Sequence, residues 1–402
     1  MPATLDTTYN FLPLSEPRFL IEPYLKSYYL KTNRIKRSPK QQDKFTSLPY
    51  EIICHIISHL DGPTLCRLAS VSRKWFRLIR SNHSLWKHQT LSTFNLTLPH
   101  SNMDWYRLYQ QQAILKKRWA LGQVNTHYLL GHLDSVYCLQ FHNRFLFTGS
   151  RDKTIRCWDL KEYRTLYTLK GHQGSVLSLC FAGQLLVSGS SDGSIIVWNL
   201  QTQQPIYHWR GYHQSAVPAV CMNENYIVSC SKDQTICIWD IKTGQLKRRM
   251  LAHRGPVNAI RLVGNRLVSA SGDTLIKMWD IESGECIRKY AGHTRGIACL
   301  AFDGTRIVSG SNDKTIKVWD AESGQCIMSC EGHTDLVRSL SIDQDRIVSA
   351  GYDQTIRVWN IKTGACLLKF ESGHSSWIFD VQFDSNKIIS ASQDRRVLVM
   401  NF

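Results

Sequence analysis

Serine, histidine and aspartate recur in this sequence at spacings that could form a catalytic triad. One such set is His293, Ser309 and Asp313, which offers a hydroxyl nucleophile, an imidazole base and a carboxylate to orient the base. The pattern occurs seven times, with a hydroxyl residue 16 positions after each histidine and an aspartate four positions later. Seven copies at fixed spacing favour a structural role for these residues, and we predict no catalytic residue.

Cysteine and histidine also approach the spacing of a metal site once, at Cys326, Cys330 and His333. No matching second pair of ligands accompanies them, so we predict no metal ion there. The chain also lacks the Gly-x-x-x-x-Gly-Lys motif that cradles phosphates. We therefore expect neither a catalytic centre nor a cofactor.

The repeated residues are embedded in a unit of 40 or 41 residues that we expect to form β-strands. A tryptophan follows each histidine by 26 residues in six copies, and Met400 takes its place in the seventh. Short runs rich in Ile, Val and Trp, such as 306–309 and 315–319, are bounded by Gly, Asn, Asp and Ser. Four such strands per repeat predict an all-β, seven-bladed propeller over residues 123–402.

The two ends of this repeated region are predicted to meet. The chain stops at Phe402, directly after the segment that carries Met400, so the seventh blade lacks an outermost strand. Residues 126–130 precede the first repeat at the position where other repeats hold that strand. We expect them to complete the seventh blade and to close the ring. Met400 has no N–H to donate, so we expect weaker polar bonding in that blade.

The repeats resemble WD repeats, which open on a Gly-His pair such as Gly292-His293 and close on Trp-Asp, as at Trp319-Asp320. The resemblance covers residues from about 123 to 402. It implies that the histidine, aspartate, hydroxyl and tryptophan of one repeat form a buried hydrogen-bond chain. Such a chain satisfies polar groups whose burial without partners would cost about 1–3 kcal/mol each.

The residues before the propeller differ in character. Residues 1–43 hold several prolines and a basic cluster at 31–40, which fits a nuclear-import signal, a nucleic-acid patch or a solvated linker. Residues 44–90 show apolar spacings of three and four that predict three short helices, with a break at Asp61-Gly62-Pro63. Residues 91–122 are predicted to form a linker with a helix over 101–121.

The segment 44–90 resembles an F-box, a small helical domain. The matching residues are Leu48, Pro49, Glu51, Ile52, Ile56, Leu60, Leu65, Val71, Trp75, Leu85 and Trp86. In that family the domain binds the Skp adaptor of a cullin–RING ubiquitin ligase. The resemblance implies adaptor contacts at Leu48, Pro49, Ile52, Ile56 and Leu65. The alternative is that these apolar residues only pack the segment internally.

The resemblance to WD propellers also places the surface that would bind a partner. In that family two positions per blade face the central opening at the top: five residues after the histidine, and directly before the aspartate. Adjacent blades six, seven and one supply an aromatic and basic group there: Tyr137, Arg151, Arg338, Tyr352 and Phe379. Trp377, three residues after His374, is expected to lie beside them. Aromatic and arginine side chains are typical of binding hot spots, and arginine binds carboxylate or phosphate groups. The alternative is that the aromatic side chains pack on one another across the channel.

Together these resemblances imply a substrate receptor of a Skp–cullin–F-box (SCF) ubiquitin ligase, which binds the Skp adaptor, the cullin–RING core and a degron-bearing, possibly phosphorylated, target. A scaffold outside such a ligase is the first alternative. Nucleic-acid binding driven by the net charge of +17 is the second, and we do not favour it. No apolar run approaches 18 residues, and the N-terminus lacks a signal peptide, so no membrane association is expected. Scattered cysteines indicate a reduced, cytoplasmic or nuclear protein.

Overall fold

The computed structural model describes residues 48–94, 103–371 and 373–402, which fall into two compact units that divide between Lys116 and Lys117. The N-terminal arm 1–43 with its basic cluster, and part of the predicted linker, lie outside the described residues. The first unit is helical. Its helices are α2 (Tyr50–Ser58), α3 (Gly62–Ala69), α4 (Arg73–Ser81), α5 (His83–Phe94) and α6 (Trp105–Leu121), the last of which continues past the division.

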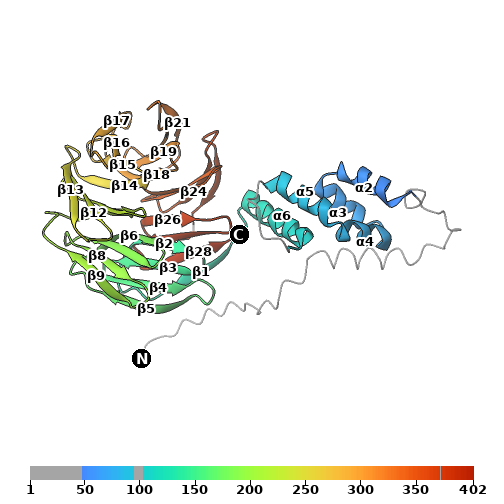
Figure 1. The fold of residues 1–402 in the computed structure, drawn as a ribbon, viewed down its shortest axis with the longest axis horizontal. Helices are drawn as coiled ribbons and strands as arrows, with labels where there is room; N and C mark the ends of the chain where they lie inside the picture. Colours follow the sequence, from blue (N-terminus) through green and yellow to red (C-terminus); the bar gives the residue numbers. More distant parts are fainter. Residues whose placement is uncertain (1–47, 95–102, 372) are drawn as a thin grey trace. The chain divides into compact units, whose positions relative to one another are not determined.

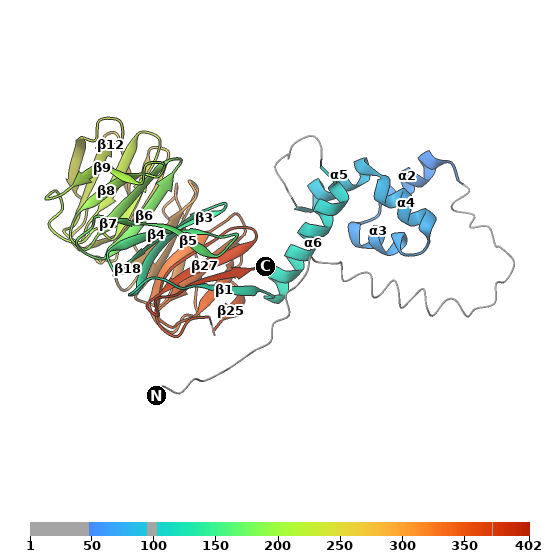
Figure 2. The ribbon, with the colours of Figure 1, turned by 90° about the horizontal axis from the view of Figure 1, so that it is seen from below.

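Four helices, α2 to α5, lie where the sequence predicted three, because the helix that begins at Gly62 is short. It ends at Ala69, and α4 begins after Ser72, whose hydroxyl accepts a hydrogen bond from the Trp75 backbone N–H at 3.2 Å. The Ser72 hydroxyl thus satisfies a backbone N–H in the first turn of α4. In a continuous helix that N–H would bond a backbone carbonyl instead. Asp61 caps α3 in the same way, accepting from Thr64 N–H. Figure 2 shows α3 and α4 as separate helices.

The helical unit has its own apolar core. Trp86 is fully buried at its centre, and the indole N–H donates to the Ile79 carbonyl at 2.8 Å. Tyr109 of α6 packs against Trp86 with ring centroids 5.0 Å apart. Gly62 makes this close approach possible, because a Cβ there would lie 1.9 Å from the Tyr109 hydroxyl.

The second unit is a seven-bladed β-propeller, as predicted (Figure 1). Each blade is a four-stranded antiparallel sheet, and the first strands of neighbouring blades lie against one another around the central axis. The strands of the first four blades are β2 (Val136–His142), β3 (Phe145–Ser150), β4 (Thr154–Asp159), β5 (Arg164–Lys170), β6 (Val176–Ala182), β7 (Leu185–Ser190), β8 (Ile195–Asn199), β9 (Gln204–Trp209), β10 (Ala219–Met222), β11 (Tyr226–Cys230), β12 (Thr235–Asp240), β13 (Leu246–Leu251), β14 (Val257–Val263), β15 (Arg266–Ser271), β16 (Ile276–Asp280) and β17 (Cys286–Tyr290). Those of the last three are β18 (Ile297–Phe302), β19 (Arg306–Ser311), β20 (Ile316–Asp320), β21 (Cys326–Cys330), β22 (Val337–Ile342), β23 (Arg346–Gly351), β24 (Ile356–Asn360), β25 (Cys366–Phe370), β26 (Ile378–Phe383), β27 (Lys387–Ser392), β28 (Val397–Asn401) and β1 (Asn125–Leu129).

The ring closes through β1, as the sequence predicted. The seventh sheet has the order β26-β27-β28-β1, and β1 runs antiparallel to β28 with Thr126 opposite Met400. The strand that enters the propeller therefore completes its last blade. Just before it, Trp119 stacks on Phe402 with ring centroids 3.6 Å apart and donates its indole N–H to the Ser385 carbonyl.

The repeated polar residues form buried hydrogen-bond chains, and the triad-like sets are structural. In the fifth blade, His293 Nδ1 lies 2.7 Å from an Asp313 carboxylate oxygen, and Nε2 lies 2.8 Å from the Ser309 hydroxyl. Trp319 donates its indole N–H to the same hydroxyl at 2.8 Å. Since the carboxylate only accepts, Nδ1 carries the proton and Nε2 accepts from the serine. We call this set the tetrad.

Two blades depart from the tetrad geometry. In the second blade, His172 Nδ1 bonds the Ser194 hydroxyl at 2.9 Å, and the Asp192 carboxylate is 3.8 Å away. In the seventh, His374 keeps its bonds to Ser390 and Asp394, but the buried Met400 supplies no donor to the serine. The weaker polar bonding expected of that blade stays a prediction.

The tetrad makes a direct prediction for stability. Trp319→Phe keeps most of the buried ring but removes the donor to Ser309, so we expect the free energy of unfolding to fall by about 1–3 kcal/mol. Chemical denaturation of the purified chain measures this. Trp377→Phe is the matched control, because Trp377 is 43% exposed and should change stability by less than about 0.5 kcal/mol. Equal midpoints for Trp319→Phe and the wild type would contradict the role given to the tetrad.

The tetrad also predicts how stability depends on pH. Burial lowers the pKa of His293, against the opposing effect of Asp313. Burial would raise the pKa of Asp313, but hydrogen bonds from Thr315 and His293 outweigh it and lower the pKa to about 2. The folded state thus favours a neutral imidazole and an ionised carboxylate. At neutral pH both groups are in these forms and contribute in full to the stability of the fold.

As the pH falls, the unfolded chain takes up protons first, at histidine below about pH 6.5 and at aspartate below about pH 4. We therefore expect the urea midpoint to decline steadily from pH 7.5 to pH 5 and more steeply below pH 4. His213 and His253, whose pKa values burial also lowers, add to the first phase. A midpoint that stays constant between pH 7.5 and pH 5 would refute this account.

Candidate functional site

The propeller surrounds a central channel of about 590 Å³, lined by the first strands of all seven blades. One of the two positions per blade named from the sequence, five residues after each histidine, lines this channel in every blade. These residues are Tyr137, Leu177, Pro218, Asn258, Ala298, Arg338 and Phe379. This residue stands at or next to the beginning of each first strand. In most blades the register against the second strand shifts at this residue, and the shift sets the direction of its side chain.

Four of the predicted site residues form one aromatic cluster, which consists of Tyr137, Tyr352, Trp377 and Phe379. Tyr352 and Trp377 stack with ring centroids 4.5 Å apart and planes 7° from parallel. Phe379 lies beneath them, 6.0 Å from Tyr352 and 4.8 Å from Tyr137. The rings thus pack on one another between neighbouring blades, whereas the alternative in the sequence analysis placed such packing across the channel. Phe379 is only 7% exposed, whereas Trp377 keeps 43% of its surface exposed.

Backbone hydrogen bonds hold the loops that carry Tyr352 and Trp377 in place. The Tyr352 N–H donates to the Leu336 carbonyl at 3.0 Å. The Trp377 carbonyl accepts from the Gln393 N–H and from the Ser392 hydroxyl, each at 2.9 Å. The two aromatic residues therefore stand on ordered loops, and a partner would meet a preformed apolar surface with little loss of loop freedom.

The two arginines of the predicted site differ in their surroundings. Arg338 lines the channel in the same ring of residues as Tyr137 and Phe379. Within the described residues, no hydrogen bond or ion pair engages its side chain. Arg151 is exposed and lies 3.7 Å from the Asp134 carboxylate. Arg338 shares the channel lining with Tyr137 and Phe379 of the cluster, whereas Arg151 is not among the lining residues.

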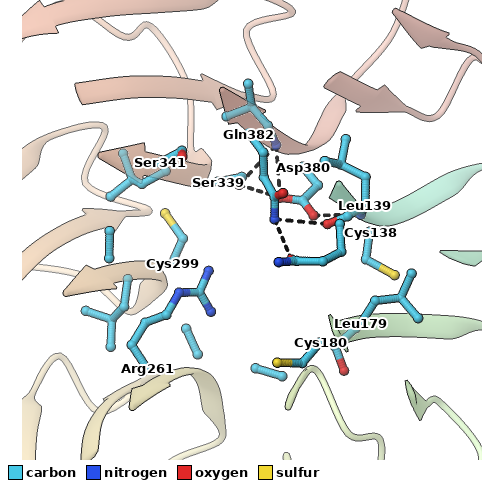
Figure 3. Close-up of a pocket in the computed structure, with 18 of the residues that line it drawn as sticks. Cys138, Leu139, Leu179, Cys180, Arg261, Cys299, Ser339, Ser341, Asp380 and Gln382 are labelled. Atoms are coloured by element: carbon cyan, nitrogen blue, oxygen red, sulfur yellow. Dashed lines mark hydrogen bonds between the residues drawn. The ribbon is translucent and has the colours of Figure 1, made fainter. Parts of the chain in front are cut away.

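Sequence reasoning missed the charged residues deeper in the channel. Arg261 and Asp380 line it farther along their strands than the position five residues after the histidine (Figure 3). The signal was available, because Arg261 stands eight residues after His253 and Asp380 stands six after His374. The comparison across repeats that found Arg338 at five residues would have found both had it continued along the strand.

Four of the five residues predicted to bind an adaptor are exposed in the helical unit. Leu48 is 38% exposed, Ile52 49% and Ile56 37%, and Pro49 is exposed beside them. The fifth prediction, Leu65, is wrong as a surface contact, because its side chain is completely buried in the core with Trp86. Tyr50, 57% exposed, lies on the same helix outside the buried pattern of Ile53 and Ile57.

The residues with the spacing of a metal site, Cys326, Cys330 and His333, have other surroundings in the structure. His333 bonds Asp353 and Ser349 through its two ring nitrogens, at 2.7 Å each. Cys326 is exposed and Cys330 is buried, and both are free thiols. Among the described residues, no group of three potential ligands gathers around a metal position. No helix in the described segments is long and apolar enough to span a membrane.

Family models match both units. An F-box-like model matches residues 45–92, and the WD domain, G-beta repeat, matches seven times: 123–159, 163–199, 203–240, 244–280, 284–320, 324–360 and 364–401. These repeats cover more than half of the chain, which therefore belongs to the WD-repeat family. It combines seven WD repeats with an F-box-like domain.

Curated relatives share segments of the chain. An F-box protein of Saccharomyces cerevisiae is 30% identical over 149 residues, which are 29% of this chain and 23% of that protein. A protein of Arthroderma otae described as a probable E3 ubiquitin ligase complex SCF subunit, sconB, is 29% identical over 163 residues, 31% of this chain and 24% of its own. The chain thus spans about a quarter of the length of these relatives.

A solved structure is similar to the propeller. The computationally designed Ika8 protein is 36% identical, with a TM-score of 0.59 over 68% of this chain and 85% of its own. The likeness supports the fold of this part of the chain.

Proposed function

We propose that this chain is the substrate-recognition subunit of an SCF-type E3 ubiquitin ligase. The observation that carries the proposal is the pairing, in one chain, of an F-box-like domain with exposed apolar residues at its first helix and a propeller with an ordered, half-exposed aromatic cluster. The names of its relatives, an F-box protein and an SCF subunit, support it. The chain would act in the cytoplasm, the nucleus or both, where its free cysteines would stay reduced.

In this role the chain contributes position. Leu48, Pro49, Ile52 and Ile56 bind a Skp-family adaptor, which joins the chain to a cullin–RING core. The recruited ubiquitin-conjugating enzyme supplies the chemistry, and the propeller holds the target close to it. Holding two reactants together raises the rate of their reaction by supplying effective concentration.

The target site follows from the cluster and its arginine. Trp377 and Tyr352 offer a flat apolar surface that suits an aromatic or aliphatic side chain of a bound peptide. Arg338 presents a guanidinium that suits a carboxylate or phosphate on the same peptide. We infer a degron with one apolar anchor and one acidic or phosphorylated residue.

Adaptor binding is tested by co-purification of the full chain with a Skp-family adaptor. The Leu48→Ala/Pro49→Ala double variant and Ile52→Asp should each lose the adaptor, because they remove apolar contacts or bury a charge in them. Ile287→Asp is the matched control for Ile52→Asp, since the two isoleucines are 51% and 49% exposed. Retention of the adaptor by both F-box variants, with the fold intact, would leave the scaffold alternative standing.

Target binding is tested by mass spectrometry of proteins captured by the adaptor-bound chain. Arg338→Glu should lower the recovery of the target by at least about tenfold while adaptor recovery stays unchanged, because it replaces a favourable charge by a repulsive one. Arg295→Glu makes the same charge change at an exposed arginine on blade five and should capture the target normally. If both variants capture it equally well, the target binds elsewhere.

A further inference from the structure

The channel below the aromatic cluster holds a ring of side chains that the proposed function does not use. We call it the lumen ring. It consists of the residues eight positions after each tetrad histidine: Gln140, Cys180, Cys221, Arg261, Ala301, Ser341 and Gln382. Arg261 is its one charged member. We propose that the lumen ring binds a small oxyanion, such as a phosphate or a carboxylate group, with the Arg261 guanidinium as its principal ligand.

The first argument is that Arg261 has spare donors. Its guanidinium carries five N–H groups, and the hydrogen bond described for it is one from Nη1 to the Ile260 carbonyl at 3.0 Å. No carboxylate among the described residues lies within ion-pair distance of it. Figure 3 shows its head directed into the open space of the channel, across from Asp380 and Gln382. Donors that face this space without a partner favour an acceptor there.

The second argument is that the Asp380 carboxylate, which also lines the channel, already accepts hydrogen bonds from the wall. Asp380 accepts a hydrogen bond from the Leu139 N–H at 2.8 Å through one oxygen. Its other oxygen accepts from the Ser339 hydroxyl at 2.7 Å and from the Val381 N–H at 2.9 Å. This carboxylate joins blades six, seven and one, and its bonds hold it to the wall.

The third argument concerns the total charge of the lining. Its charged members are Arg261, Arg338, Asp380 and Asp384, and Asp384 is paired with Lys387 at 3.2 Å. Burial raises the pKa of Cys180 and of Cys221, so these two ring members are neutral thiols beside Arg261. The two arginines therefore face one wall-bound carboxylate, and the channel favours an anion over a cation.

The fourth argument is the set of neutral donors in the same ring. Gln382 accepts from the Phe141 N–H through its amide oxygen, so its amide nitrogen donates, to the Gln140 side-chain oxygen at 2.7 Å. The Gln140 side-chain oxygen therefore accepts, and the N–H groups of the same amide have no partner among the described residues. The Ser341 hydroxyl also has no described hydrogen bond. Arg261 stands on blade four, on the far side of the ring from blades seven and one, so an oxyanion in the lumen would find donors on more than one side.

The anion could reach this ring from two sources with the same chemistry. It could be a free ion such as phosphate, or an acidic side chain of a peptide that binds at the aromatic cluster and extends into the channel. The second source rests on the proposed function, but the first does not. The test begins with free phosphate, which needs neither an adaptor nor a target.

The experiment measures thermal unfolding of the full chain in increasing sodium phosphate, with sodium chloride holding ionic strength constant. A bound anion raises the midpoint in a saturable way. We expect this for the wild type and for Arg254→Gln, an exposed arginine of the same blade. Arg261→Gln should bind phosphate at least about tenfold more weakly, and Arg261→Lys should lie between, because lysine keeps the charge but loses the planar donor fork.

Circular dichroism in sodium chloride verifies that each variant is folded. No saturable effect of phosphate on the wild type, or an equal effect on wild type and Arg261→Gln, would overturn the proposal. Isothermal titration of the wild type with phosphate gives the stoichiometry, and a value other than one ion per chain would equally overturn a single site in the lumen ring.

A second arm separates the sources. If a peptide supplies the anion, Arg261→Gln lowers target capture and phosphate competes with the target. If the ion is free, Arg261→Gln loses phosphate and captures the target as before. Both results support the site. If the proposed function fails, the wild type captures no adaptor or no target, but phosphate still stabilises it and not Arg261→Gln.

Discussion

The propeller depends on satisfying a polar group buried in each blade, the serine or threonine hydroxyl at the centre of the tetrad. In the fifth blade this hydroxyl of Ser309 meets His293 and Trp319 within 2.8 Å, and it is completely shielded from water. A buried hydroxyl without partners would destabilise the sheet that contains it. The tetrad removes that penalty and ties the loop before each first strand to the second and third strands, so the top loops are held where the aromatic cluster needs them.

The seventh blade shows how the fold tolerates a missing member. Met400 fills the space of a tryptophan without its N–H, and the blade is joined to both neighbours by other means. Asp380 accepts from Leu139 on one side and from Ser339 on the other, and Gln382 bonds Gln140. These bonds lie on the channel wall, so the residues that hold the last blade in the ring also shape the lumen ring.

Much of this architecture followed from the sequence because it is periodic. Fixed spacing predicted the number of blades and the strand that closes the ring, since each copy confirms the others, and the resemblance to WD repeats implied the tetrads. The helical unit has no repeat, and there the predictions were weaker. Leu65 lies on an apolar helix face like Ile52 and Ile56, but which face is covered depends on where α5 and α6 pack, and a single helix pattern does not contain that information. The same holds for the break at Ser72, where one capping hydroxyl outweighs a continuous apolar pattern.

The pairing of β1 with β28 also matters while the protein is being made. Asn125 pairs with Asn401, so the first strand of the propeller to leave the ribosome has as its partner the last one. At 5–20 residues per second, roughly 15–55 s separate the two. Until then β1 has no sheet to join, and six blades can assemble around an open gap. A ribosome-bound intermediate of this kind exposes unpaired strand edges, which are prone to aggregation until this seam closes.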